Sequence, residues 1–207
     1  MKKRVLFYLV LTTVLSSVSY AQKAKVSSAN KNYGNYAYVD AIQTYERLAN
    51  KGYQSAEMFE KLGNAYYFNA DFEKAAKWYS ALFSMNKNQG SEYLYRYSQT
   101  LKSTGEYDKA AKMLDQFNKA TGNDLRAKLY EKHKNYLEEI KSNSGRFEIV
   151  DAGINSEYSD YGGSFFGDKL VFASARDTGG VSKNIFKWNN QSFTNLYASK
   201  IGLDNNL

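Results

Sequence analysis

Apolar residues between positions 38 and 117 recur with the spacing of amphipathic helices. Offsets of 0, 3, 4, 7 and 10 residues, which place side chains on one face of a helix, occur at Tyr38, Ala41, Ile42, Tyr45 and Leu48. The same offsets occur at Phe72, Ala75, Ala76, Tyr79 and Leu82, and again at Tyr107, Ala110, Ala111, Leu114 and Phe117. The steps between these sets are 34 and 35 residues. A repeat of this length predicts an array of stacked helix pairs.

A further helix is expected before the second and third sets, as the partner in each pair. Residues 55–69 have apolar side chains on one face and contain the pair Leu62–Gly63, whereas the next unit has Ser98 in place of the glycine. The paired alanines allow neighbouring helices to approach to about 8–10 Å. Together these features, clearest in residues 59–82, resemble the tetratricopeptide repeat. The resemblance implies an α-α superhelix that binds other proteins.

The flanks of the array are less regular. Residues 22–36 are polar, and two interpretations stay open, a tether or a frayed first helix. A last helix is predicted from Asp124 to Ser142, and it is expected to cover the end of the array with one apolar side formed by Leu125, Leu129, His133, Leu137 and Ile140. We therefore predict a polar lead-in at 22–37 and a repeat domain with its capping helix at 38–143, containing two full repeats and one partial unit before them.

The pattern changes to that of short strands near Gly145. An opening strand-like segment contains Phe147, Ile149 and Val150, and a loop rich in Ser, Gly and Asp follows. Three further strands are predicted at 169–174, 184–188 and 193–199, each bounded by turn residues. The predicted fold class is mainly α, a tetratricopeptide-type superhelix followed by a short antiparallel β segment at 144–207.

The segment Ile154 to Asp177, INSEYSDYGGSFFGDKLVFASARD, adds a second resemblance. It is similar to the WD40-like β-propeller repeats that follow tetratricopeptide repeats in envelope proteins of Bacteroidota. In that family a signal peptide, helical repeats, a propeller and a peptidoglycan-binding OmpA-like domain follow one another, and some members are associated with type IX secretion. The resemblance implies an incomplete propeller blade here. We expect a truncated chain, rather than a tail that packs on the helices or is poorly ordered.

The first 21 residues have the three parts of a secretory signal peptide. A basic start, Met1 to Arg4, precedes an apolar core from Val5 to Leu15 and the small-residue cleavage site Ser19-Tyr20-Ala21. The apolar core is shorter than the roughly 20 residues that span a bilayer, so no transmembrane segment is expected after cleavage. The predicted location is the periplasm, in association with the outer membrane.

Charge and cysteine content narrow the range of partners. Cleavage would lower the net charge from +7 to +4, because the leader holds three of the 28 basic residues and none of the 21 acidic ones. This balance argues against a nucleic-acid partner. The chain has no cysteine, so it has neither a disulfide nor the lipid-modified cysteine of a lipoprotein.

No residue pattern predicts a catalytic, cofactor or metal site, and we predict that the protein is not an enzyme. His133 is interpreted as a partly buried residue with a hydrogen-bond partner, since no cysteine or second histidine completes a zinc site. The glycine-rich segment 162–169 does not match a phosphate-binding loop, because Asp168 stands where the motif requires lysine. We expect a turn there, with Gly162 and Gly163 at positive φ. Three aspartates are interpreted as turn residues rather than calcium ligands or paired acids: Asp160, Asp168 and Asp177.

The predicted binding site is a groove on the first helices of the pairs. Its residues mix rings, amides and one lysine, and they are Asn64, Tyr67, Phe68, Tyr95, Gln99 and Lys102. Such a surface suits an extended peptide, and Glu57 and Glu60 argue against an acidic C-terminal one. The alternative is that these side chains are solvated or pack on a neighbouring domain.

The predicted function is a non-catalytic envelope scaffold that binds an envelope protein or peptide. In a longer parent protein it would link an outer-membrane or secretion complex to peptidoglycan, which would be bound only by the C-terminal domain. The alternative is an exported propeller enzyme or glycan-binding protein with a helical appendage.

Overall fold

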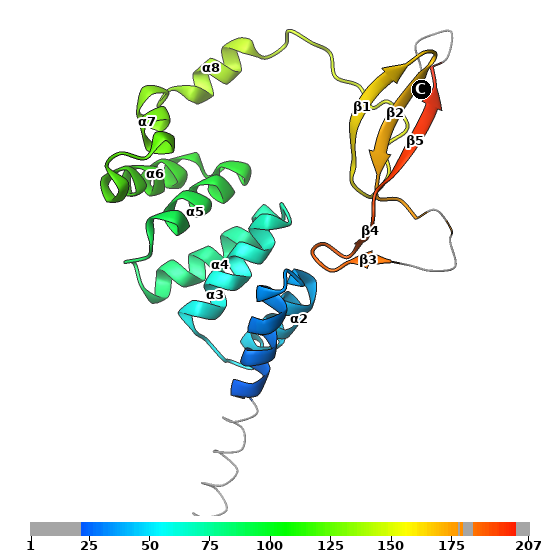
Figure 1. Ribbon diagram of the computed structural model, residues 1–207. Coiled ribbons are helices and arrows are strands. Elements are labelled where there is room, and N and C mark those ends of the chain that lie inside the picture. The colour runs from blue at the N-terminus through cyan, green and yellow to red at the C-terminus, as the bar shows by residue number, and fades with distance from the viewer. Residues whose placement is uncertain (1–21, 178, 180–183, 202–207) are drawn as a thin grey trace, which may run out of the picture. The chain divides into compact units, whose positions relative to one another are not determined.

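The computed structural model describes residues 22–177, 179 and 184–201. Contacts divide the chain between Lys132 and His133 into a helical unit and a second unit that contains the strands (Figure 1). The predicted signal peptide lies outside the described residues. The predicted fold class, helix pairs in a repeat followed by a short antiparallel sheet, is confirmed.

The helical unit is built from successive antiparallel helices (Figure 1). Residues 22–34 form the first of them. The others are α2 (Tyr38–Ala49), α3 (Ala56–Phe68), α4 (Phe72–Met85), α5 (Ser91–Ser103), α6 (Tyr107–Thr121) and α7 (Leu125–Lys132). α3 packs on α4, and α5 packs on α6 and α4. The helix at 22–34 completes a pair with α2, so the partial unit expected from the sequence is a whole pair.

The predicted apolar stripes form the core of this unit. Ala41, Ala75 and Ala110, which are equivalent in the three pairs, are fully buried. Gly63 allows the close approach of α3 and α4, because a Cβ atom there would lie 2.6 Å from the ring of Tyr79. Its counterpart Ser98 is also buried, and its hydroxyl donates to the carbonyl oxygen of Tyr95 at 2.6 Å. Serine in place of glycine therefore remains buried at this position of the repeat.

The turn between the two helices of each pair contains one residue in the left-handed region. These residues are Tyr36 at φ 59°, Ala70 at φ 56° and Gly105 at φ 79°. They are 34 and 35 residues apart, so they occupy the same place in the three pairs. Ser55 and Asp71 cap the following helices by accepting hydrogen bonds from the amides of Met58 and Lys74.

The prediction of one continuous helix from Asp124 to Ser142 is wrong, because two short helices occupy this segment. α7 ends at Lys132, and α8 (Tyr136–Asn143) belongs to the second unit. Ala127 of α7 is the buried residue, and it packs with Leu94 and Phe117. This contact turns Leu125 and Leu129 of α7 outward, so that Leu125 is 69% exposed. Leu137 and Ile140 lie on α8, and they are exposed as well, Ile140 by 62%. His133 is partly buried, as predicted, and its Nδ1 lies 3.4 Å from Glu139 Oε2.

The second unit contains a three-stranded antiparallel sheet of order β1-β2-β5 and a two-stranded ribbon (Figure 1). The sheet consists of β1 (Asp160–Phe166), β2 (Lys169–Ser174) and β5 (Asn195–Lys200), and the ribbon of β3 (Ile185–Phe186) and β4 (Gln191–Ser192). Phe172 lies opposite Tyr197 in the register of β2 and β5. The strand predicted at 169–174 is confirmed, and the two later ones are shorter or shifted.

Three expectations for this unit are wrong. The segment of Phe147, Ile149 and Val150 is not a strand, and these side chains are exposed, because no strand of the described chain pairs with them. β1 lies instead where a loop was predicted, with an irregular register between Tyr161 and Ser164. Gly162 has the expected positive φ of 70° and forms this bulge, whereas Gly163 does not adopt positive φ.

Asp160 is an ion-pair partner in strand β1 rather than a turn residue. Its Oδ1 lies 3.0 Å from Arg176 Nη2, which also donates to the carbonyl oxygen of Ile154 at 2.7 Å. Hydrogen bonds from Ser174 and Ser156, together with Arg176, hold the pKa of Asp160 well below its usual value. The described residues contain no group of three His, Cys, Asp or Glu side chains that could hold a metal ion.

Candidate protein-binding face

The first helices of the three pairs and the following helix α7 form one continuous face, which we call the first-helix face. It consists of residues 22–34, α3, α5 and α7. Polar side chains join each helix to the next: Asn30 donates to Glu57 at 3.0 Å, Arg96 Nη1 to Asn64 Oδ1 at 2.7 Å, and Arg126 Nη1 to Glu92 Oε2 at 3.0 Å. These contacts fix the spacing of the helices along the face.

Two buried tyrosines hold the amides of this face in place. The hydroxyl of Tyr79 donates to Asn64 Oδ1 at 2.8 Å, and that of Tyr45 donates to Asn30 Oδ1. The two contacts are equivalent, since both partners are displaced by 34 residues. Burial raises the pKa of Tyr79 and of Tyr45 far above the ordinary value, so both hydroxyls remain protonated donors at neutral pH.

The predicted site residues of α3 do not share one environment. Asn64 is only 6% exposed, so the expectation that it lies open on the face is wrong. Its oxygen is occupied by Tyr79 and Arg96, which explains its burial. Phe68 is 36% exposed and Tyr67 is half-buried, with their rings 5.9 Å apart in an edge-to-face arrangement.

The predicted site residues of α5 are all half-buried. The Tyr95 ring lies 5.3 Å from the ring of Phe117 and 4.3 Å from the guanidinium of Arg126, which also lies 5.0 Å from the Phe117 ring. Gln99 donates to the hydroxyl of Ser98 at 3.1 Å. Burial lowers the pKa of Lys102. The structure thus brings all six predicted residues to one face, with Asn64 beneath its surface; whether they bind a partner stays a prediction.

Rings at the inter-helix turns form a cluster beside this face, which we call the aromatic rim. Its members are Tyr33, Tyr36, Tyr38, Tyr67, Phe68 and Phe72. Tyr38 is central, with ring centroids 5.1 Å from Tyr33, 6.2 Å from Tyr36 and 5.7 Å from Phe68. Tyr67 joins Phe68 to Phe72, whose ring lies 5.8 Å away. Arg96 lies 4.9 Å above the Phe68 ring.

Four residues of this region were not predicted from the sequence as site residues: Asn30, Tyr33, Tyr36 and Arg96. The 34-residue repeat could have identified two of them, because Asn30 and Tyr33 lie 34 residues before Asn64 and Tyr67. Extending the repeat backwards from α3 would have found the first helix as well. No local pattern marked Arg96, which depends on the neighbouring helix for its position.

Two carboxylates of the first-helix face, Glu57 and Glu92, form ion pairs within the protein. Glu57 lies 2.6 Å from Lys61, and Glu92 is shared by Arg96 and Arg126. Arg126 also pairs with Asp124 at 3.0 Å, which lowers the pKa of Asp124. The face therefore has matched charges rather than a field of one sign.

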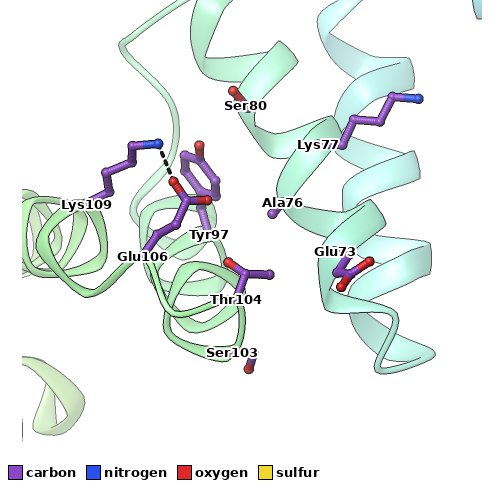
Figure 2. Close-up of a pocket in the computed structure, with 9 residues that line it drawn as sticks. All are labelled: Glu73, Ala76, Lys77, Ser80, Tyr97, Ser103, Thr104, Glu106 and Lys109. Atoms are coloured by element: carbon purple, nitrogen blue, oxygen red, sulfur yellow. Dashed lines mark hydrogen bonds and ion pairs between the residues drawn. The ribbon is translucent and has the colours of Figure 1, made fainter. Parts of the chain in front are cut away.

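A separate cleft of about 550 Å³ lies between α4 and the α5–α6 turn (Figure 2). Its nine lining residues are Glu73, Ala76, Lys77, Ser80, Tyr97, Ser103, Thr104, Glu106 and Lys109. Figure 2 shows Lys109 in an ion pair with Glu106 and Lys77 directed away from Tyr97. These groups do not converge on one point, which favours the first-helix face as the binding site.

The chain was compared with known proteins. Neither a protein-family model nor a curated protein sequence matches it. Among solved structures, it is similar to the C-terminal part of a TPR repeat-containing protein from Cytophaga hutchinsonii, with 20% identity and a TM-score of 0.47. The match covers 56% of this chain and 45% of that one, so the chain spans less than half the length of that structure. Within the described residues, no helix is long and apolar enough to cross a membrane.

Proposed function

We propose that this protein is a non-catalytic scaffold whose first-helix face holds an extended segment of a partner protein. The supporting observation is the continuous row of amides, rings and paired charges on residues 22–34, α3, α5 and α7. Helical repeats stack into long surfaces of this kind, which fit a chain lying across several units.

The half-buried side chains of the face have the chemistry that a peptide requires. The amide of Gln99 can pair with backbone N–H and C=O groups, and the rings of Tyr67, Phe68 and Tyr95 can cover apolar side chains. These groups are held by contacts within the protein, so little side-chain freedom is lost when a partner binds.

The proposed setting is the cell envelope. The predicted signal peptide supports export to the periplasm, and the resemblance of residues 154–177 to propeller repeats of envelope proteins supports association with the outer membrane. In a longer parent protein, a peptidoglycan-binding domain would then anchor the partner held by the helices. The similarity to a TPR repeat-containing protein does not bear on this setting.

Photo-crosslinking tests the position of the partner directly. A benzophenone amino acid replaces Gln99 on the first-helix face, and in a control it replaces Lys112, which is exposed on α6. After irradiation in an envelope extract of the source organism, we expect a defined crosslinked protein from position 99 and none from position 112. Equal crosslinking from both positions, or none from position 99, would contradict the proposal.

A further inference from the structure

Tyr36 has an unfavourable backbone conformation. Its φ of 59° lies in the left-handed region, where a Cβ atom crowds the following carbonyl oxygen and only glycine is at ease. The equivalent turn residues are Ala70 and Gly105, so the third pair shows the residue that the turn itself prefers. A bulky residue in this region is an outlier that calls for a reason beyond the turn.

Burial in the core does not supply that reason. The Tyr36 side chain is 62% exposed, and its ring meets the Tyr38 ring edge-on, with centroids 6.2 Å apart. Tyr38 in turn stacks on Phe68 at 5.7 Å. The strained turn therefore places a largely exposed ring at the end of the aromatic rim, next to the predicted site residues of α3.

We propose that Tyr36 is a partner-contacting residue, and that the aromatic rim docks an uncharged, extended peptide segment containing proline or aromatic side chains. The inference rests on the proposed protein-binding function and names the chemistry of the partner. Strained residues cluster at binding sites, where the surrounding structure holds them in place.

The charges around the rim select for an uncharged segment. Lys61 lies 5.8 Å from the Tyr33 ring but is already paired with Glu57. Arg96 covers Phe68 but is already bound to Glu92 and Asn64. An acidic or basic peptide would meet ions whose charge is neutralised, whereas rings gain from stacking on proline and aromatic side chains.

The probe is an array of ten-residue peptides in three classes: neutral with proline and aromatic residues, acidic, and basic. Capture of the purified chain is measured for the wild type and three variants. Tyr36→Gly relieves the strain and removes the ring, and Ala70→Gly relieves the same strain one pair later without removing a ring. A third variant, Gln99→Ala with Lys102→Ala, changes the first-helix face away from the rim.

We expect the wild type to prefer the neutral class. Tyr36→Gly should lower that capture about fivefold or more, the scale of one aromatic contact, without lowering the melting temperature. Ala70→Gly should raise the melting temperature and leave capture unchanged, since only backbone strain differs.

The outcomes separate this inference from the proposed function. If Tyr36→Gly captures peptides like the wild type while the Gln99→Ala and Lys102→Ala variant does not, the rim inference fails and the scaffold proposal stands. A preference for charged peptides, or a lower melting temperature for Tyr36→Gly, would also overturn the inference. If the wild type captures no class, both proposals fail.

Discussion

A single buried amide, Asn64, links three helices of the protein. It lies on α3, and its oxygen accepts hydrogen bonds from Tyr79 of α4 and Arg96 of α5. Because Arg96 also covers the ring of Phe68, the amide sets the position of a guanidinium on the aromatic rim. Asn64 therefore fixes the position of Arg96 beside the first-helix face.

Replacing Asn64 with alanine should lower the free energy of unfolding by about 2 kcal/mol, because a buried hydroxyl and a guanidinium nitrogen lose their acceptor. Gln99→Ala is the matched control, because Gln99 occupies in the third pair the position that Asn64 occupies in the second. The position of Tyr79 is taken there by Leu114, which has no hydroxyl to donate. Urea unfolding followed by circular dichroism at 222 nm measures both. Equal losses for the two variants would show that Asn64 has no special role.

The sequence predicted which residues share a helix face, but not which of them are exposed. The helical period assigned Asn64, Tyr67 and Phe68 to the first-helix face correctly. The helical period does not show which side chain of a neighbouring helix contacts Asn64. That side chain is Arg96, which lies 32 residues further along the chain. The burial of Asn64 thus depends on contacts from other helices, which the residue pattern of its own helix does not reveal.

At the scale of elements, α7 shows how a small residue can decide the orientation of a helix. Ala127 is 1% exposed and fits between Leu94 and Phe117. The larger apolar residues Leu125 and Leu129 face outward as a result. The sequence prediction weighted residues by hydrophobicity, whereas packing at this site admits only a small side chain.

The orientation of α7 is tested by placing arginine at two positions. Ala127→Arg should lower the free energy of unfolding by about 3 kcal/mol, because a long charged side chain does not fit a packed site. Leu129→Arg should change it by less than about 0.5 kcal/mol, as is usual for surface positions. Thermal unfolding at 222 nm distinguishes the two. The reverse order would mean that the sequence-predicted apolar side faces the core.

The strands were less predictable than the helices, for a physical reason. β2 was found because its apolar residues pair with strands on both sides. Phe147, Ile149 and Val150 have the same strand character but no neighbouring strand in the described chain. A sheet needs partners distant in sequence, and β1, rich in glycine, gave no apolar alternation to reveal it.

At the scale of the whole molecule, the chain divides into two units with different means of stabilisation. The helical unit uses apolar stripes repeated every 34 or 35 residues. The second unit uses the polar cluster of Arg176, Asp160 and Ser174, beneath which Phe172 and Tyr197 stack with ring centroids 6.0 Å apart. The division falls at His133, earlier in the chain than the boundary predicted at 143.

The polar cluster should make the second unit sensitive to acid. The folded pKa of Asp160 is lower than its unfolded value of about 3.9, so the folded state binds fewer protons. Its stabilising contribution is therefore complete above about pH 5 and is lost as the pH falls further. The urea midpoint of Trp188 fluorescence, measured in a Trp78→Phe background, should decrease from pH 6 to pH 3.

Asp160→Asn is the control for the acid effect, because the amide does not titrate. It should lower the urea midpoint at pH 6 and flatten its pH dependence. A wild-type midpoint that stays constant down to pH 3, or an Asp160→Asn variant with the full acid response, would remove Asp160 from the explanation.

The bulge in β1 also affects how molecules of this protein meet one another. β1 is an edge of the three-stranded sheet, and a regular edge would offer a straight row of amide and carbonyl groups to a strand of a second molecule. The break in register between Tyr161 and Ser164 bends that row at Gly162. We therefore expect Gly162 to make the β1 edge a poorer template for a strand of a second molecule.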